Sequence, residues 1–290
     1  MRWRANPSGS RSRALTALLR DPMGLMGLVL VSLFVAMAIA APLLAPYDPL
    51  ALDVRAKLQA PSLAHWLGTD QLGRDTLSRI IYGARTALSI SLSAIGIAGT
   101  VGLLLGLIAG YGPRWLDALL VLLFDSLNSL PMVMFALAII TVIGPGTGTL
   151  ILVVVLVSIP GYARLIRAQT LALRGSDFIV AEQAIGASTA RIILRHLLPN
   201  VVGPLCIVLS MDIPVVIMLE AGLSYLNLGV KPPTPSWGNV LSDGYASIRT
   251  TSTLVIAAGA PLVLATLGFT FLGEGLRDAL DPRLQQTRPR

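Results

Sequence analysis

Acidic side chains inside long apolar stretches are the residues of this sequence with the most obvious chemical potential. Asp125, Asp212 and Glu220 each stand in a block that is otherwise almost free of charge. A carboxylate on a lipid-facing helix costs about 2.5 to 3.5 kcal/mol on insertion scales, so these groups should face a polar pathway or a partner. We predict that they line or gate such a pathway, while a structural hydrogen bond near the membrane face is an equal alternative for Glu220.

Other reactive residues do not form a catalytic pattern. His65 and His196 are far apart, and neither a metal-ligand spacing nor a Gly-x-Ser-x-Gly elbow occurs. Lys57 and Lys231 do not follow a glycine-rich phosphate-binding sequence, and Cys206 has no second cysteine with which to form a disulfide. The sequence therefore predicts no enzyme activity, no cofactor and no metal for this chain, although an intramembrane enzyme stays a minor alternative.

The composition points to lipid as the surrounding medium. Of 290 residues, 54% are hydrophobic and only 13% are charged, with a mean hydropathy of +0.75. Soluble domains carry nearly twice that share of charge, so this chain cannot cover itself with polar surface in water. The net charge of +7 is mostly arginine beside apolar blocks, which is typical of membrane proteins and argues against nucleic acid as a partner.

Six apolar blocks are long enough to cross a bilayer as helices. One long block is divided by the glycine-rich turn at residues 144–148, which gives two helices joined by a hairpin. The blocks run over residues 22–47, 86–113, 118–163, which this turn divides into two spans, 201–228 and 250–273. Small residues at Ala36, Ala38 and Ala40 also allow the first block to be a cleaved signal peptide, but its length favours a retained anchor.

The arginines predict the orientation. Six spans with the N-terminus inside place the arginine-rich ends and the segment 164–200 in the cytoplasm, while the turn at 144–148 has no charge. The expected organisation is a cytoplasmic segment at 1–23, a first transmembrane helix at 24–45 and a periplasmic loop at 46–85. A five-helix core follows at 86–275, with a cytoplasmic coupling segment at 164–200 and a cytoplasmic tail at 276–290. Aromatic residues near the span ends should act as interfacial anchors: Tyr47, Trp66, Trp115 and Trp237.

The segment 164–200 is longer than a simple connection requires. Residues 177–185 predict a short helix, Gly186 to Ser188 a break, and residues 189–198 a second helix stopped by Pro199. Small residues at Ala181, Ala184 and Ala187 leave a face into which another protein could pack. On composition alone, an interfacial helix lying on lipid headgroups is the favoured alternative.

A resemblance to a known family favours docking to another protein over an interfacial helix. The run Ala181, Glu182, Gln183, Ala184, Ile185, Gly186, Ala187, Ser188, continuing to Leu197, Leu198, Pro199 and Asn200, resembles the EAA loop of ABC-importer permeases. In that family the loop forms a coupling helix that docks into a cleft on the ATPase subunit. Val180 stands where the family usually has a glutamate, and Glu182 lies two positions later. The resemblance assigns ATPase coupling to Ala181, Glu182, Ala184, Ile185, Gly186, Ala187 and Ser188.

Further motifs resemble the C-type permease subunit of dipeptide, oligopeptide and nickel importers over nearly the whole chain. They are Asp21–Pro22, residues 65–70 followed by Gly73, Arg74 and Asp75, residues 164–167, and residues 232–238. The resemblance implies an all-α membrane protein with six transmembrane helices and the MetI-like fold of type I ABC importers, in a bacterial inner membrane. It also implies four partner subunits: a homologous B-type permease, two ATPases that use ATP and magnesium, and an extracytoplasmic solute-binding protein.

The main rival is a secondary transporter driven by an ion gradient. Such a protein is expected to pair ionisable residues near mid-membrane, and Asp125 and Asp212 keep this reading open. It would not need a long docking loop. The substrate of an importer could be a peptide, nickel or another small solute, because selection rests largely with the binding protein.

Overall fold

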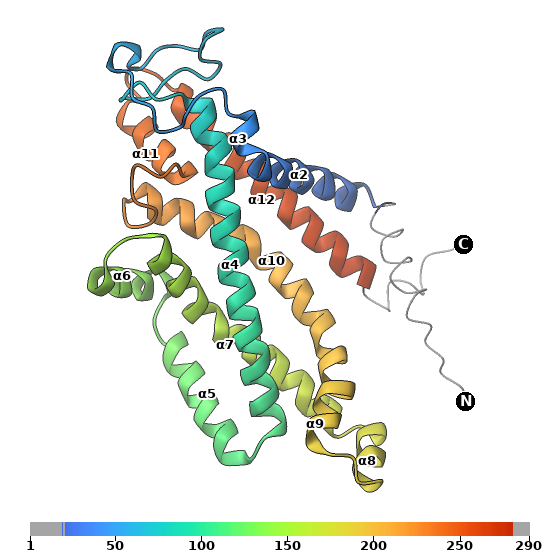
Figure 1. The fold of residues 1–290 in the computed structure, drawn as a ribbon. Coiled ribbons are helices and arrows are strands. Elements are labelled where there is room, and N and C mark those ends of the chain that lie inside the picture. The colour runs from blue at the N-terminus through green and yellow to red at the C-terminus, as the bar shows by residue number, and fades with distance from the viewer. Residues whose placement is uncertain (1–18, 20, 281–290) are drawn as a thin grey trace. The chain divides into compact units, whose positions relative to one another are not determined.

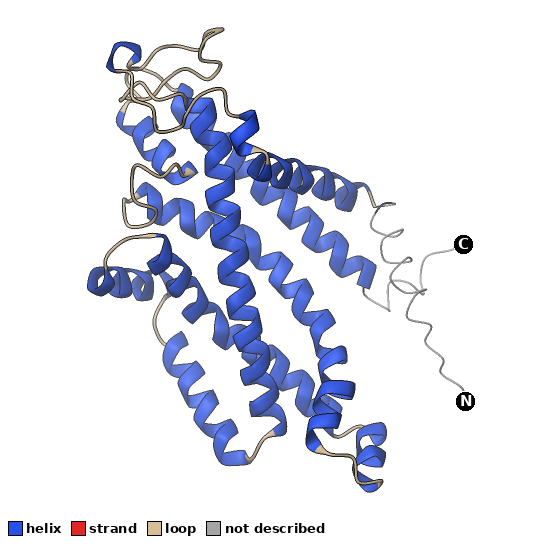
Figure 2. Ribbon diagram, viewed as in Figure 1, coloured by secondary structure: helices blue, strands red, loops and turns tan. Residues whose placement is uncertain are grey.

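A computed structural model describes residue 19 and residues 21–280 of the chain. Every regular element in this part is helical (Figure 2), as the sequence predicted. Within it, five helices are long and apolar enough to cross a membrane, and a sixth span results if the bent pair α5 (Arg114–Asn128) and α6 (Met132–Ile143) is counted as one. The described residues form two compact units, to which α4 (Thr76–Tyr111) and α10 (Leu198–Tyr225) each contribute residues.

One unit comprises Met1–Leu88, Ser210–Tyr225 and Pro232–Arg290, as far as these are described. It contains α2 (Pro22–Ile39), α3 (Ala41–Leu44), the short 3-10 helix η1 (Val54–Ala56), α11 (Trp237–Ala246) and α12 (Thr253–Leu280). Helices α2 and α12 lie side by side (Figure 1), because Gly27 and Gly268 remove side chains from their contact. A Cβ atom on Gly27 would lie 2.4 Å from the Leu272 nitrogen, so only glycine fits there.

The local sequence explains where α2 begins. Asp21 accepts a hydrogen bond from the Gly24 nitrogen at 2.8 Å, and Pro22 occupies the first turn, where its missing N–H is no loss. The helix ends at Ile39, earlier than the predicted boundary at residue 45, and α3 follows it.

The other unit comprises Ser89–Leu209 and Leu226–Lys231. Its elements are α5 (Arg114–Asn128), α6 (Met132–Ile143), α7 (Thr147–Arg174), α8 (Asp177–Ala184), α9 (Thr189–Ile192) and the π-helical segment η2 (Ile193–Leu197). Glycines at every fourth position of α4 let α7 approach closely: Gly102 faces Tyr162, Gly106 faces Ala163 and Ile166, and Gly110 faces Thr170.

Several predicted boundaries were wrong. Helix α4 begins at Thr76, ten residues inside the stretch expected as loop, because its charged first turns form ion pairs instead of requiring solvent. Helix α7 continues to Arg174, and the predicted third span is bent by 87° between α5 and α6, where Pro131 precedes Met132. The predicted break at residues 144–148 is confirmed, since α6 ends at Ile143 and α7 begins at Thr147.

Pro199 does not stop a helix, contrary to the prediction. Helix α9 passes through η2 into α10, and Pro199 lies in the first turn of α10. A proline lacks the N–H that an α-helix would bond to residue 195, and the wider π turns directly before it accommodate that loss. The consequence is a continuous helical path from Thr189 to Tyr225.

Candidate functional site

The predicted break around Gly186 separates α8 from α9. Gly186 has a φ of +82°, a left-handed conformation that favours glycine, and a Cβ atom there would meet nothing within 4 Å. After the break, the Ser188 hydroxyl accepts a hydrogen bond from the Arg191 nitrogen at 3.4 Å and caps α9. The short helix and the break were therefore placed correctly from the sequence.

Helix α8 is held by one apolar side chain and two polar contacts. Ile179 is fully buried. Glu182 Oε1 lies 3.5 Å from Nε2 of His196 in η2, and the Gln183 amide donates to the Tyr111 hydroxyl at 3.2 Å. These contacts tie α8 to η2 and to the end of α4, a role for His196 and Tyr111 that the sequence analysis missed because the pairs are distant in sequence.

Most of the predicted coupling residues are exposed. Ala181, Ala184, Gly186 and Ser188 are exposed together with Ile185, whose side chain is 79% accessible, whereas Glu182 and Ala187 are half-buried. Phe178 and Val180 add to the exposed apolar surface of the same helix. Exposed apolar side chains on and directly after a short helix are suited to bind in a groove of another protein.

Two ion pairs join α5 to α7. Arg167 bonds both oxygens of Asp117, at 2.5 and 2.7 Å, and Arg164 lies 3.1 Å from Asp125. The structure thus gives Asp125 a partner on the neighbouring helix. Asp117 was not singled out, since a charged residue at the edge of an apolar block carries no distinct signal.

The other two acidic residues named above both lie on α10. Glu220 is fully buried and accepts a hydrogen bond from the Ser224 hydroxyl at 2.7 Å. Asp212 is half-buried.

The loop before α4 contains a buried ion-pair cluster. Asp70 accepts from Arg74 at 2.6 Å and also from Arg79, and Arg79 bridges to Asp243 of α11 at 2.9 Å. Asp70, Arg74 and Arg79 are buried. We call this group of Asp70, Arg74, Arg79 and Asp243 the loop cluster.

Trp237 is a core residue, contrary to its predicted role as an interfacial anchor. Its side chain is completely buried, and the indole N–H donates to the Ile80 carbonyl at 2.9 Å. Gly83 leaves room for the ring, since a Cβ atom there would lie 2.6 Å from it. Trp66 and Trp115 are exposed, as an interfacial position requires.

In the described residues, no group of three or more histidine, cysteine, aspartate or glutamate side chains is arranged to hold a metal ion.

Comparison with known proteins defines the family. The model of the binding-protein-dependent transport system inner membrane component matches residues 102–286, and that of the N-terminal TM domain of oligopeptide transport permease C matches residues 11–61. A dipeptide transport system permease protein of Alkalihalophilus pseudofirmus is 37% identical over 272 residues, covering 94% of this chain and 90% of the relative. A glutathione transport system permease protein of Escherichia coli is 39% identical over 267 residues, covering 92% and 88%.

A solved structure agrees on the fold. An inward-facing conformation of the MetNI methionine ABC transporter aligns with a TM-score of 0.58 at 17% identity, covering 71% of this chain and 98% of the matched chain. The present chain therefore belongs to the family of binding-protein-dependent transport system inner membrane components. It is a multi-pass integral membrane protein with a MetI-like fold, a permease subunit of the ABC importer class.

Proposed function

We propose that this chain forms half of the pathway by which an ATP-driven importer moves short peptides or similar small solutes across the bacterial inner membrane. Its relatives are named as dipeptide, di/tripeptide and glutathione permeases, and short peptides are the substrate class these names share. The other half would come from a homologous B-type permease. A solute-binding protein outside the cell would deliver the substrate.

The energy source in this proposal is a pair of ATPase subunits that use ATP and magnesium, docked on α8. The supporting observation is the exposed apolar surface of α8 and of the residue that follows it, contributed by Phe178, Val180 and Ile185. A soluble protein groove would cover this face and leave Glu182 and Gln183 bonded to their own unit. An interfacial helix on headgroups is expected to carry Lys or Arg beside its apolar face, and α8 has neither.

Transport would follow from a difference in binding between two states. When ATP closes the ATPase pair, the docked α8 moves, and the helices attached to it transmit the motion. Only two residues separate α7 from α8, and α9 leads through η2 into α10, so α8 is flanked in sequence by two long helical segments. No chemical step is required of this chain.

Orientation is the first test of the proposal. Because Cys206 is the only cysteine, a Cys206→Ala background allows one reporter cysteine at a time. Ile185, directly after α8, and Leu63, on the loop before α4, are both highly exposed, at 79% and 97%, and are the sites of the reporter variants Ile185→Cys and Leu63→Cys. In intact cells, a membrane-impermeant maleimide should label Leu63→Cys only, and Ile185→Cys should react after the membrane is opened. The reverse pattern would overturn the proposal.

Docking and energy source need a second test. Ile185→Cys should form a crosslink to the ATPase subunit in the purified complex, and Leu63→Cys should form none. Uptake in vesicles should stop without ATP and continue when the membrane potential is collapsed. Uptake that follows the potential and ignores ATP would support the secondary transporter instead.

A further inference from the structure

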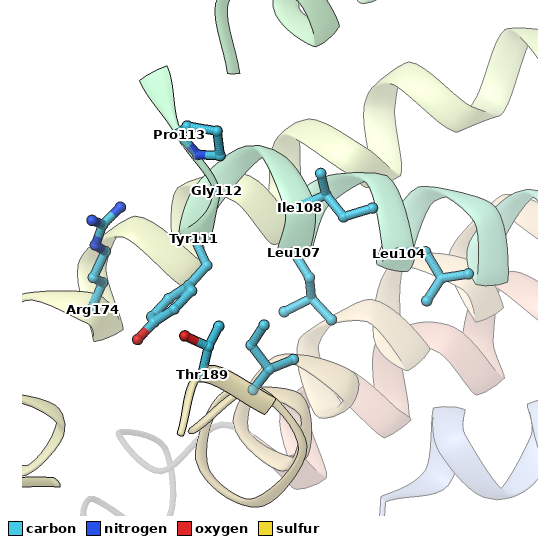
Figure 3. Close-up of a pocket in the computed structure, with 9 residues that line it drawn as sticks. Leu104, Leu107, Ile108, Tyr111, Gly112, Pro113, Arg174 and Thr189 are labelled. Atoms are coloured by element: carbon cyan, nitrogen blue, oxygen red, sulfur yellow. The ribbon is translucent and has the colours of Figure 1, made fainter. Parts of the chain in front are cut away.

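Two adjacent cavities lie beside the turn between α4 and α5. The first, of about 560 Å³, is lined mainly by apolar side chains of α4 and by Thr189 and Ile193 (Figure 3). The second, of about 750 Å³, is lined by the ends of α4, α5 and α7 and contains three arginines. Both cavities lie within one compact unit, and they share Gly112, Pro113 and Arg174.

The charges of the second cavity are unbalanced. Arg114, Arg167 and Arg174 line it together with one carboxylate, Asp117, which is already bonded twice by Arg167. Within the described part of the chain, neither Arg114 nor Arg174 forms an ion pair with a carboxylate. Arg174 lies over the Tyr111 ring, 5.3 Å from its centroid, which holds the guanidinium at the boundary between the two cavities.

The first cavity has a different character. Leu104, Leu107 and Ile108 line it along successive turns of α4 (Figure 3), and Leu104 is 55% exposed. Tyr111 lies between these apolar side chains and Arg174, whose guanidinium lies over the tyrosine ring. A charged end and an apolar channel in contact with each other match a molecule with a phosphate head and a hydrocarbon tail.

The cavities also lie at a level suited to a lipid. Tyr111 ends α4, Trp115 stands in the first turn of α5 with 68% exposure, and Arg174 ends α7. Aromatic rings and arginines at helix ends are typical of the membrane interface. Basic pockets between membrane helices at this depth bind the headgroups of anionic lipids.

We propose that this pair of cavities is a binding site for one anionic phospholipid. Its phosphate contacts Arg114 and Arg174, and one acyl chain lies along Leu104, Leu107 and Ile108. The site connects the end of α7 to the start of α9, the two elements that flank α8, so an occupied site braces the base of α8. A lipid bound there is a component of the transporter rather than a transported solute.

Native mass spectrometry of the full-length chain, purified with its accompanying subunits, tests the assignment. Dioleoylphosphatidylglycerol should bind in preference to dioleoylphosphatidylcholine. Each of Arg114→Gln and Arg174→Gln should weaken the preferred lipid about fivefold, and the double variant about 25-fold, as expected for one charge each at a lipid phosphate. Arg174→Lys should keep most of the affinity. Arg191→Gln, an exposed arginine outside both cavities, is the matched control and should bind as the unmodified chain does.

The tail and the rival ligands are tested separately. Leu104→Trp should fill the apolar cavity and weaken the long-chain lipid, whereas Leu119→Trp, 45% exposed on α5 but outside both cavities, should not. Displacement of the lipid by millimolar inorganic phosphate would show a simple anion site and overturn the proposal. Unchanged lipid binding by the double arginine variant, with loss of the ATPase subunit, would assign the arginines to a protein contact and also overturn it.

Discussion

The loop cluster and α8 are both polar stretches between apolar blocks in the sequence, yet the structure treats them in opposite ways. In the loop cluster, Asp70, Arg74 and Arg79 are buried against one another and against Asp243. In α8, the polar residues Glu182 and Gln183 bond to His196 and Tyr111 of the same unit, while Val180 and the following Ile185 remain exposed. The first region satisfies its charges internally, and the second leaves apolar surface available to another protein.

This contrast indicates that the loop cluster serves the stability of the fold, whereas the exposed residues of α8 serve its function. Buried charges that bond to one another tolerate no loss of a partner, since the remaining charge is left in an apolar setting. Exposed apolar side chains contribute little to the folded chain, so their presence needs another explanation. Substitutions in the loop cluster should therefore act on folding, and those on the exposed face of α8 should act on coupling.

The largest effect is expected at Asp70. Asp70→Ala leaves Arg74 and Arg79 with only the partly exposed Asp243 and should cost about 3 to 5 kcal/mol of stability. Thermal unfolding of the purified transporter, together with its yield, measures this. Asp278→Ala, an exposed aspartate of α12, should change stability by less than about 0.5 kcal/mol. Equal behaviour of the two variants would mean that the buried pairs do not hold the loop.

The next effect concerns the attachment of α8. Ile179→Ala removes its fully buried side chain and should cost about 2 to 4 kcal/mol, confined to the local opening of α8. Hydrogen exchange should speed up in α8 while the global unfolding temperature changes little. Val180→Ala, next to it but 53% exposed, is the matched control and should leave exchange unaltered. A global loss of stability with Ile179→Ala would remove the distinction between the two regions.

Gly186 distinguishes backbone strain from docking. Gly186→Glu should leave the chain inserted, allow ATP hydrolysis to continue and reduce uptake by about 30-fold or more, the effect of losing one central interface residue. Gly186→Ala imposes only the left-handed strain of about 1 kcal/mol, and Gly186→Asn imposes less because asparagine tolerates that conformation. Of the three variants, Gly186→Asn should therefore retain the most uptake, Gly186→Ala less, and Gly186→Glu the least. Normal uptake by Gly186→Glu would exclude α8 as the coupling element.

The sequence predicted elements better than it predicted their ends. Apolar blocks and the glycine-rich turn at 144–148 gave the spans, because hydropathy and glycine chemistry act locally. The extension of α4 back to Thr76 could not be seen, since Arg79 looks like a loop residue until Asp70 and Asp243 are placed beside it. Pro199 misled for a similar reason: η2 relieves the missing hydrogen bond, and π turns have no clear sequence pattern.

In the candidate site, the residue types alone predicted the short helix and the break after it. Gly186 and Ser188 signal them locally, because a positive φ favours glycine and the Ser188 hydroxyl caps a helix that begins one residue later. The partners of Asp125 and Trp237 could not, since Arg164 and Ile80 reach them from other helices. Trp237 shows the limit clearly: an aromatic residue near a span end has the same sequence signature whether it faces lipid headgroups or a core.

The smallest effect should come from comparing the two ion pairs between α5 and α7. Arg167 makes two bonds to Asp117 with both side chains half-buried, whereas Arg164 makes one contact with Asp125, whose side chain is 64% exposed. Double-mutant cycles with glutamine and asparagine should give a coupling of about 1.5 to 3 kcal/mol for the first pair and less than about 1 kcal/mol for the second. Thermal unfolding of the purified transporter measures both. If the Arg164 pair proved the stronger, Asp125 would have to be shielded by another subunit, and its exposed position would become part of the permease interface.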